Sequence, residues 1–166
     1  MTQRLFEKKQ KLLKIKQWML KSAKNLKEIN SLLWIAVFEI FFKNRREIMK
    51  LMIVDDASFM RVFIRRMIEK TDFEVVCEAC DGKDAIAKFI QYKPDIITMD
   101  ITMPNLTGIE ALKEIKKIST MVKVIMVSAM GQEPLVREAV INGADSFIIK
   151  PFKEEKLIEV LEAMNK

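Results

Sequence analysis

The chain has 166 residues, of which half are hydrophobic and 31% are charged. This balance excludes an intrinsically disordered chain, and the length suits one domain with an appendage. The net charge of +6 is unevenly distributed: residues 1–48 contain 12 Lys and Arg against 4 Asp and Glu, whereas residues 49–166 contain 17 against 19. The basic character therefore belongs to the first 48 residues.

Residues 1–48 form a basic N-terminal extension that contains no Gly, Pro or Asp. Its apolar stretch at 32–42 is interrupted by Glu39 and is too short for a bilayer, which needs about 20 apolar residues. The Lys-rich flanks are compatible with a helix on an anionic membrane surface or with an arm that binds nucleic acid. Alternatively, Met49 is the natural start, and the extension is a misassigned start or a loosely ordered segment. These interpretations stay open.

Residues 49–166 alternate between short apolar runs and segments with helical spacing. The apolar runs predict buried strands at about 51–54, 74–77, 95–99, 122–127 and 146–149. The intervening segments predict helices at roughly 58–70, 82–92, 107–117, 133–142 and 153–165. Because the strands are apolar throughout, we expect one α/β domain with a doubly wound, five-stranded parallel sheet covered on both faces. Periodicity does not specify the order of the strands.

The first expected helix carries an apolar stripe close to i, i+3, i+4 spacing. Its members are Phe59, Val62, Phe63, Met67 and Ile68.

Cys77 and Cys80 form a C-x-x-C pair, which raises a redox or a zinc hypothesis. Cys77 lies inside an expected strand rather than at a helix start, and the chain has no His and no second Cys pair to complete a zinc site. We therefore interpret the pair as a small buried side chain with an incidental neighbour. Reduced thiols suit a cytoplasmic protein.

Polar residues follow four of the five expected strands: Asp55 and Asp56, Asp100, Ser128 and Lys150. The carboxyl ends of parallel strands meet at one edge of a sheet, where α/β proteins bind ligands. Three carboxylates gathered there would repel one another without a cation, and Mg²⁺ prefers carboxylate oxygens. A carboxylate can act as a nucleophile, while a hydroxyl and an ammonium group can bind phosphoryl oxygens. The set predicts a cation-dependent phosphoryl site.

Each of these residues also has a plain structural interpretation. Asp55 or Asp56 could cap the first helix, and Asp100 could be one more acid in a loop. Ser128 could be a turn residue and Lys150 a solvated surface charge. Their joint occurrence at the strand ends favours the site.

Four motifs carry a resemblance to a known family. They are LMIVDD at 51–56, MDITMP at 99–104 followed by Gly108, VSA at 127–129 and IKPF at 149–152. Together they resemble the receiver domain of bacterial two-component response regulators, over residues 50–165. Within that family, segments 100–104 and 128–132 are similar to chemotaxis regulators from outside the enteric bacteria. The resemblance implies a flavodoxin-like (βα)5 three-layer sandwich.

The resemblance also implies a role for each polar residue. Asp100 would be the phosphoacceptor. Asp56 and Asp100 would bind Mg²⁺ through their side chains, Thr102 through its backbone carbonyl and Asp55 through a water molecule.

The remaining roles concern the switch. Ser128 would bond a phosphoryl oxygen, and Lys150 would pair with the phosphate. The Lys150–Pro151 bond would be cis. Phe147 stands at the position of an aromatic rotamer switch, where many relatives have Tyr, so a polar role for this side chain in recognition is in doubt.

The function implied is that of a single-domain response regulator in the cytoplasm. Because the chain lacks His, its phosphodonor must be another protein, by resemblance the histidine kinase CheA. By resemblance, the output face of 133–142, 146–149 and 153–165 binds the flagellar switch protein FliM. The chain ends just past its last helix, so we expect no DNA-binding or enzymatic output domain. We also expect a monomer. Whether a dedicated phosphatase acts on it is not decided by the sequence.

Two alternatives remain. The domain could be a phosphorelay intermediate that passes its phosphoryl group to a phosphotransfer protein. An aspartate-nucleophile phosphatase would share the fold but usually has a second Asp two residues after the nucleophile, where this chain has Thr102.

Overall fold

The computed structural model describes Lys14 and residues 48–165. The chain divides into two units, 1–46 and 47–166, of which the second is described below. The interpretations of the basic extension concern residues outside the described ones and stay predictions. Within the described residues, no helix has the length and apolar character needed to cross a membrane.

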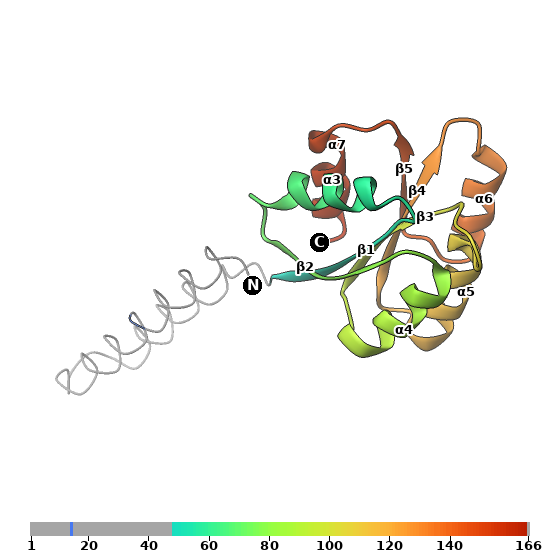
Figure 1. Cartoon of the computed structure of the whole chain (residues 1–166), viewed down its shortest axis with the longest axis horizontal. Helices are drawn as coiled ribbons and strands as arrows, with labels where there is room; N and C mark the ends of the chain where they lie inside the picture. Colours follow the sequence, from blue (N-terminus) through green and yellow to red (C-terminus); the bar gives the residue numbers. More distant parts are fainter. Residues whose placement is uncertain (1–13, 15–47, 166) are drawn as a thin grey trace, which may run out of the picture. The chain divides into compact units, whose positions relative to one another are not determined.

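The second unit alternates strands and helices along its whole length (Figure 1). The strands are β1 (Met49–Val54), β2 (Phe73–Ala79), β3 (Ile96–Asp100), β4 (Lys123–Ala129) and β5 (Ser146–Lys150). The helices are α3 (Ser58–Ile68), α4 (Gly82–Tyr92), α5 (Gly108–Ile118), α6 (Glu133–Ile141) and α7 (Glu154–Ala163).

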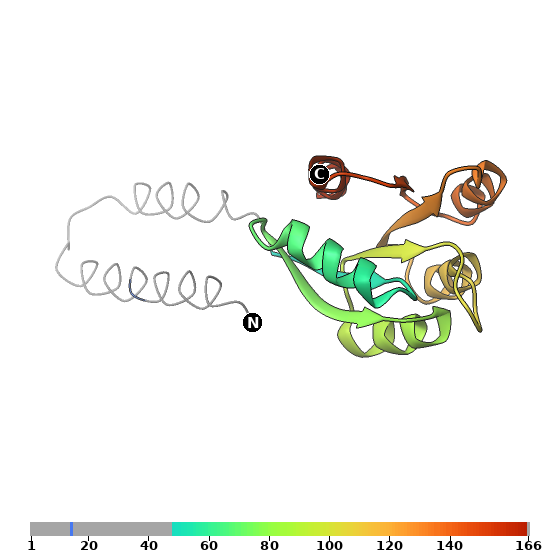
Figure 2. The same cartoon turned by 45° about the horizontal axis from the view of Figure 1, so that its top comes forward.

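The five strands form one parallel sheet in the order β2-β1-β3-β4-β5. Helices α3 and α7 lie on one side of the sheet, and α4, α5 and α6 lie on the other (Figures 1 and 2). The predicted doubly wound, three-layer α/β fold is therefore confirmed. Strands β2 and β3 lie on opposite sides of β1, so the strand order reverses between β1 and β3. The carboxyl ends of β1 and β3 are therefore the expected ligand site.

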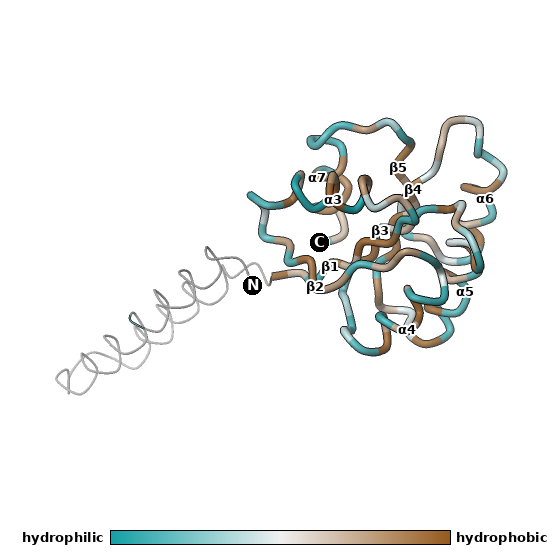
Figure 3. Tube along the Cα trace, in the orientation of Figure 1, coloured by the Kyte–Doolittle hydropathy of each residue, from teal (hydrophilic) through white to brown (hydrophobic). Residues whose placement is uncertain are grey.

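Alternate residues of each central strand enter two separate hydrophobic cores. In β1, Leu51 and Ile53 pack beneath α3 and α7, whereas Met52 and Val54 face α4 and α5. All four side chains are buried, which is why the strand is apolar throughout. Figure 3 shows this as brown, hydrophobic colour along the central strands, with teal on the outer turns of the helices.

The apolar stripe expected on the first helix does not form a single buried face. The core-facing residues of α3 are Ile64, Met67 and Ile68. Phe59, Val62 and Phe63 are exposed, and the rings of Phe59 and Phe63 stack with centroids 5.9 Å apart. The predicted stripe therefore combines residues from two neighbouring faces of the helix. One face is buried and contains Met67 and Ile68, and the other is exposed and contains Phe59, Val62 and Phe63.

The interpretation of the cysteines holds. Cys77 is buried in β2 and burial raises the pKa of its thiol to about 11, whereas Cys80 is exposed after the strand. Both thiols are free. A buried, protonated thiol is unsuited to redox chemistry, which requires the thiolate.

Candidate functional site at the carboxyl edge of the sheet

The predicted polar residues lie at the carboxyl ends of four strands, along one edge of the sheet. Asp55 directly follows β1, Asp100 and Lys150 are the last residues of β3 and β5, and Ser128 is the second-last residue of β4. The first expected strand ended at the correct residue, Val54, whereas the other four ended one or two residues too early, because hydrogen bonding continues after the apolar run has stopped. The structure brings Asp55, Asp100 and Lys150 into direct contact.

Lys150 bridges the two buried carboxylates. Its Nζ donates to Asp55 Oδ2 at 2.8 Å and to Asp100 Oδ1 at 2.7 Å. Asp55 is 1% exposed and Asp100 is 5% exposed. Because β4 lies between β3 and β5, the Lys150 side chain must reach across a strand end. Lys150 is thus a structural cation of the site and not a solvated surface charge.

The burial of these groups shifts their protonation. Burial raises the pKa of Asp100, and the hydrogen bond from Lys150 opposes this shift. The nearby charges of Asp55 and Asp56 raise it further. For Lys150, burial alone would lower the pKa, but the hydrogen bonds to Asp100 and Asp55 outweigh burial and raise it. The ammonium group is therefore firmly charged, while excess negative charge remains around Asp100.

Asp55 is held by its backbone as well as by its side chain. Its N–H donates to the carbonyl of Ala79 at 3.2 Å, and its Oδ1 accepts from the N–H of Ala57 at 3.0 Å. Helix α3 is capped by Ala57, without a side-chain cap bond. The alternative that Asp55 or Asp56 caps this helix is therefore wrong.

The other predicted residues surround this pair. Asp56 is exposed, and its carboxylate has no hydrogen bond within the described part of the chain. Thr102 is exposed, and its N–H donates to Asp100 Oδ2 at 3.2 Å. Ser128 is buried and its hydroxyl has no partner in the described region, a situation shared only with Thr98. An unsatisfied buried hydroxyl costs about 1–3 kcal/mol, so a ligand oxygen that accepted a hydrogen bond from Ser128 would remove this cost.

The donor set fits a divalent cation bound together with an anion. Three carboxylates against one ammonium group leave two negative charges around Asp100. Residues 48–165 contain no group of three acidic, His or Cys side chains close enough to enclose a metal by themselves. Mg²⁺ does not require such a cage, because it typically keeps several waters and binds one or two carboxylates plus phosphate oxygens.

The predicted switch residue, Phe147, lies in β5, and the predicted cis bond directly follows this strand. Phe147 is 45% exposed and pairs with Met126 of β4, two residues before Ser128. The Lys150–Pro151 peptide bond is cis, as predicted.

Two contacts at the site were not predicted from the sequence, although Gly108 itself belongs to the motifs that carry the resemblance. Gly108, at the start of α5, packs against the backbone of Asp100 so closely that a Cβ would overlap its carbonyl oxygen. Arg61 of α3 donates from Nη1 to the carbonyl of Asp55 at 2.7 Å and to that of Asp56 at 3.3 Å. The contact of Arg61 depends on the position of α3 relative to the loop, so an arginine five residues after an acidic pair does not predict it.

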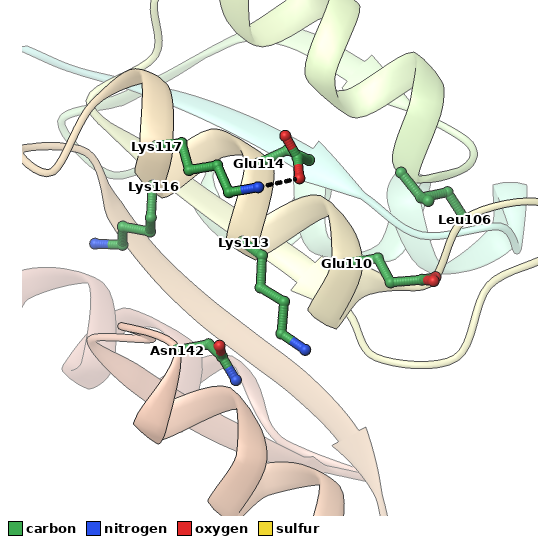
Figure 4. Close-up of a pocket in the computed structure, with 7 residues that line it drawn as sticks. All are labelled: Leu106, Glu110, Lys113, Glu114, Lys116, Lys117 and Asn142. Carbon is green, nitrogen blue, oxygen red and sulfur yellow. Dashed lines mark hydrogen bonds and ion pairs between the residues drawn. The ribbon is translucent and has the colours of Figure 1, made fainter.

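Apart from this site, a concave region lies between α5 and α6 and has a volume of about 590 Å³ (Figure 4). It is lined by Leu106, Glu110, Lys113, Glu114, Lys116, Lys117 and Asn142. Each lysine is already paired with an acid: Lys117 with Glu114, as the dashed line in Figure 4 shows, Lys113 with Glu138, and Lys116 with Asp145. This pocket therefore offers no free cation for an anionic ligand.

Comparison with known proteins agrees with the geometry. Residues 51–162 match the response regulator receiver domain. The chain is 48% identical over 117 residues to the chemotaxis protein CheY of Thermotoga maritima, covering 70% of this chain and 98% of that protein. It is 50% identical over 117 residues to CheY of Bacillus subtilis, covering 70% of this chain and 95% of that protein.

Solved structures show the same likeness. The response regulator domain of Thermotoga maritima CheB matches with a TM-score of 0.63 and 43% identity, covering 70% of this chain and 93% of that one. The Borrelia burgdorferi complex of CheX with CheY, BeF₃ and Mg²⁺ matches with a TM-score of 0.66 and 34% identity, covering 69% and 87%. The chain therefore belongs to the response regulator receiver family of two-component systems, whose members are phosphoacceptor switches, and it is a chemotaxis response regulator.

Proposed function

We propose that Asp100 accepts a phosphoryl group from a histidine kinase and that the phosphorylated chain signals to the flagellar motor switch. The observation that carries this proposal is the joint placement of two buried carboxylates, one shared ammonium group and one unpartnered buried hydroxyl at the carboxyl edge of the sheet. Phosphoryl transfer needs a nucleophile, positioning and charge neutralisation, and these groups supply all three.

Each residue contributes one step. A carboxylate oxygen of Asp100 attacks the phosphorus of a phosphohistidine, forming an O–P bond as the P–N bond breaks. Lys150 moves one of its hydrogen bonds from the carboxylates to a phosphoryl oxygen. Ser128 then donates its free hydroxyl proton to a second phosphoryl oxygen, which satisfies a group that is otherwise buried without a partner.

Receiver domains of this type use Mg²⁺. We assign Asp56 and Asp100 as side-chain ligands, the carbonyl of Thr102 as a backbone ligand, and Asp55 as a ligand through water. When bound, the cation would neutralise the charge that builds up on the transferring phosphoryl group. Asp56 suits this role because its exposed carboxylate has no hydrogen bond within residues 48–165.

The output face would be formed by α6, β5 and α7. Its exposed apolar residues are Val140, Ile141, Phe147 and Ile149. Exposed apolar clusters of this kind mark protein-binding surfaces. From the chemotaxis relatives, we propose CheA as the phosphodonor and FliM as the protein that binds this face. Both proposals imply a cytoplasmic protein.

A second candidate function is that of a phosphorelay intermediate. The observation that favours it is the exposed apolar patch of Phe59, Val62 and Phe63, which lies on α3 directly after the acidic pair. A phosphotransfer protein must approach Asp100 from this edge, so an apolar patch beside the site could contact it. The two functions differ in whether the phosphoryl group leaves Asp100 for another protein.

The nucleophile is tested by replacing Asp100 with Asn. We expect Asp100→Asn to abolish labelling by phosphoramidate in the presence of Mg²⁺, measured on the intact protein by mass spectrometry, because an amide is not a nucleophile for phosphorus. Asp95→Asn is the matched control, since Asp95 directly precedes the same strand at its opposite end. Labelling of Asp100→Asn at the wild-type rate would show that the nucleophile is misassigned. Transfer from phosphorylated CheA, but not from unrelated kinases, would support the assigned donor.

A further inference from the structure

Arg61 connects the acidic loop to the neighbouring strand. Its side chain is 18% exposed and lies between the β1–α3 loop and β2. Nη1 donates to the carbonyl oxygens of Asp55 at 2.7 Å and Asp56 at 3.3 Å. Nε donates to Glu78 Oε2 at 3.2 Å. One guanidinium group therefore contacts two successive peptide groups and a fixed carboxylate.

Glu78 is held from both sides. Its Oε1 accepts from Arg65 Nε at 2.7 Å and forms an ion pair with Arg65 Nη2 at 2.6 Å. Its own carbonyl accepts from Lys88 Nζ at 2.6 Å, which ties β2 to α4. Arg61 and Arg65 thus share one carboxylate, but only Arg61 also reaches the acidic loop.

The contact matters most for Asp56. Asp55 is already fixed by Ala79, Ala57 and Lys150. Asp56, in contrast, receives a hydrogen bond only from Arg61 within the described residues. The direction of an exposed side chain follows the orientation of its peptide group, and in this part of the chain Arg61 is the group that holds the carbonyl of Asp56.

We infer that Arg61 is a positioning residue, which holds the β1–α3 loop so that Asp56 presents its carboxylate to a divalent cation beside Asp100. The inference rests on the proposed function. Arginine suits this task because its planar fork donates in several directions at once, whereas lysine offers a single point charge. Groups that orient ligands of a metal usually change its affinity by about 10- to 100-fold when they are removed.

The test is calorimetric titration of the full chain with Mg²⁺, which needs no phosphodonor. We expect Arg61→Lys to raise the Kd for Mg²⁺ by about tenfold, because lysine keeps the charge but cannot contact Glu78 and both carbonyls together. Arg65→Lys is the matched control and should bind Mg²⁺ like the wild type. Asp56→Ala removes the proposed ligand itself and sets the upper limit of the effect.

The outcomes separate the inference from the proposed function. If the wild type fails to bind Mg²⁺, the proposed function fails with it. If the wild type binds and Arg61→Lys matches Arg65→Lys, the inference alone is overturned. In phosphoramidate labelling, Arg61→Lys should need more Mg²⁺ for half-maximal rate yet approach the wild-type rate at saturation, which a general loss of structure would not produce. Should Arg61→Lys fold poorly, Glu78→Gln must raise the Kd in the same direction, and an unchanged Kd there also overturns the inference.

Discussion

At the scale of single residues, the position of Asp100 is set by what surrounds its backbone as much as by its side chain. Lys150 holds one carboxylate oxygen, and the N–H of Thr102 holds the other. Gly108 donates its N–H to the carbonyl of Ile101 at 2.9 Å and lies against the carbonyl group of Asp100. The proposed phosphoacceptor therefore lies at a strand end whose backbone is in contact with the start of α5.

Gly108→Ala tests this support. At the first position of a helix, alanine would ordinarily stabilise the chain by up to about 1 kcal/mol relative to glycine. Here a Cβ would overlap the carbonyl oxygen of Asp100 and lie 3.0 Å from its carbonyl carbon, and neither atom can move without shifting the site. We expect a loss of about 1–3 kcal/mol in the free energy of unfolding, measured with urea, together with slower phosphoramidate labelling.

Gly131→Ala is the control for that change. Gly131 has a φ of 82°, but no atom lies within 4 Å of its added Cβ. The substitution Gly131→Ala should lower the free energy of unfolding by about 1–2 kcal/mol through backbone strain alone. It should leave the geometry at Asp100 unchanged. Equal labelling rates for Gly108→Ala and the wild type would show that the close packing does not position the nucleophile.

The sequence predicts some of these residues and not others for physical reasons. Asp100 and Lys150 follow apolar runs, and parallel strands align their ends, so their convergence could be predicted without the structure. Arg61 acts through backbone carbonyls, which carry no sequence signal. Phe59, Phe63 and Met67 follow one another at i, i+4 spacing, and each such step turns by about 40° around the helix. The stripe therefore begins on an exposed face at Phe59 and reaches the buried face at Met67.

At the scale of elements, α6 is the most weakly packed helix of the described domain. It has nine residues, of which only Ala139 is buried. Its C-terminal end is well anchored, since Glu138 pairs with Lys113 of α5 and the following loop is held by Asp145. Its N-terminal cap, Gln132, makes no side-chain cap bond to the helix and instead accepts from the N–H of Ala129. Helix α6 is thus held firmly at its C-terminal end, away from the site, and only loosely at its N-terminal end, beside the site.

Asp145 is the centre of that anchor. Its carboxylate accepts from Lys116 Nζ at 2.8 Å, from Lys123 Nζ at 3.0 Å and from the N–H of Val124 at 2.9 Å. Burial alone would raise the pKa of Asp145, but these hydrogen bonds outweigh it and hold the pKa below its ordinary value of 3.8. A carboxyl whose pKa is lower in the folded than in the unfolded chain stabilises the fold at pH values above its unfolded pKa. That stabilisation is lost as the pH falls through the folded pKa.

Asp145→Asn should therefore destabilise the domain in a pH-dependent way. We expect a loss of about 1–2 kcal/mol at pH 7, because the charge-assisted bonds of two lysines are weakened. The difference from the wild type should stay constant between pH 5 and 8 and shrink as the pH falls below 3.8, as measured by thermal unfolding. Glu114→Gln, in an exposed pair with Lys117, should change stability by less than about 0.5 kcal/mol. A difference that grew on acidification would contradict the anchor.

At the scale of the whole molecule, the site and the proposed output face meet on two adjacent strands. Ser128 of β4 pairs with Ile149, and Met126 pairs with Phe147, so all four residues lie on the same face of the sheet. Lys150 continues the same strand into the site. A ligand that draws in the Ser128 hydroxyl would leave space on this face, which Phe147 could fill by turning inward. The exposed apolar surface at Phe147 and Ile149 would change shape as a result.

This coupling predicts that beryllofluoride with Mg²⁺, a phosphoryl mimic, raises the affinity of the chain for an N-terminal FliM peptide. Coupling energies between sites are typically 1–3 kcal/mol, so we expect an increase of about fivefold or more, measured by fluorescence anisotropy of a labelled peptide. Ser128→Ala should lose this increase, because the mimic no longer finds the hydroxyl. Thr98→Val is the matched control, since it removes the other unpartnered buried hydroxyl, which lies in β3, a strand that does not pair with β5. Unchanged affinity in the wild type would rule out the motor-switch function and favour the phosphorelay, whereas a full increase in Ser128→Ala would show that the signal reaches Phe147 by another route.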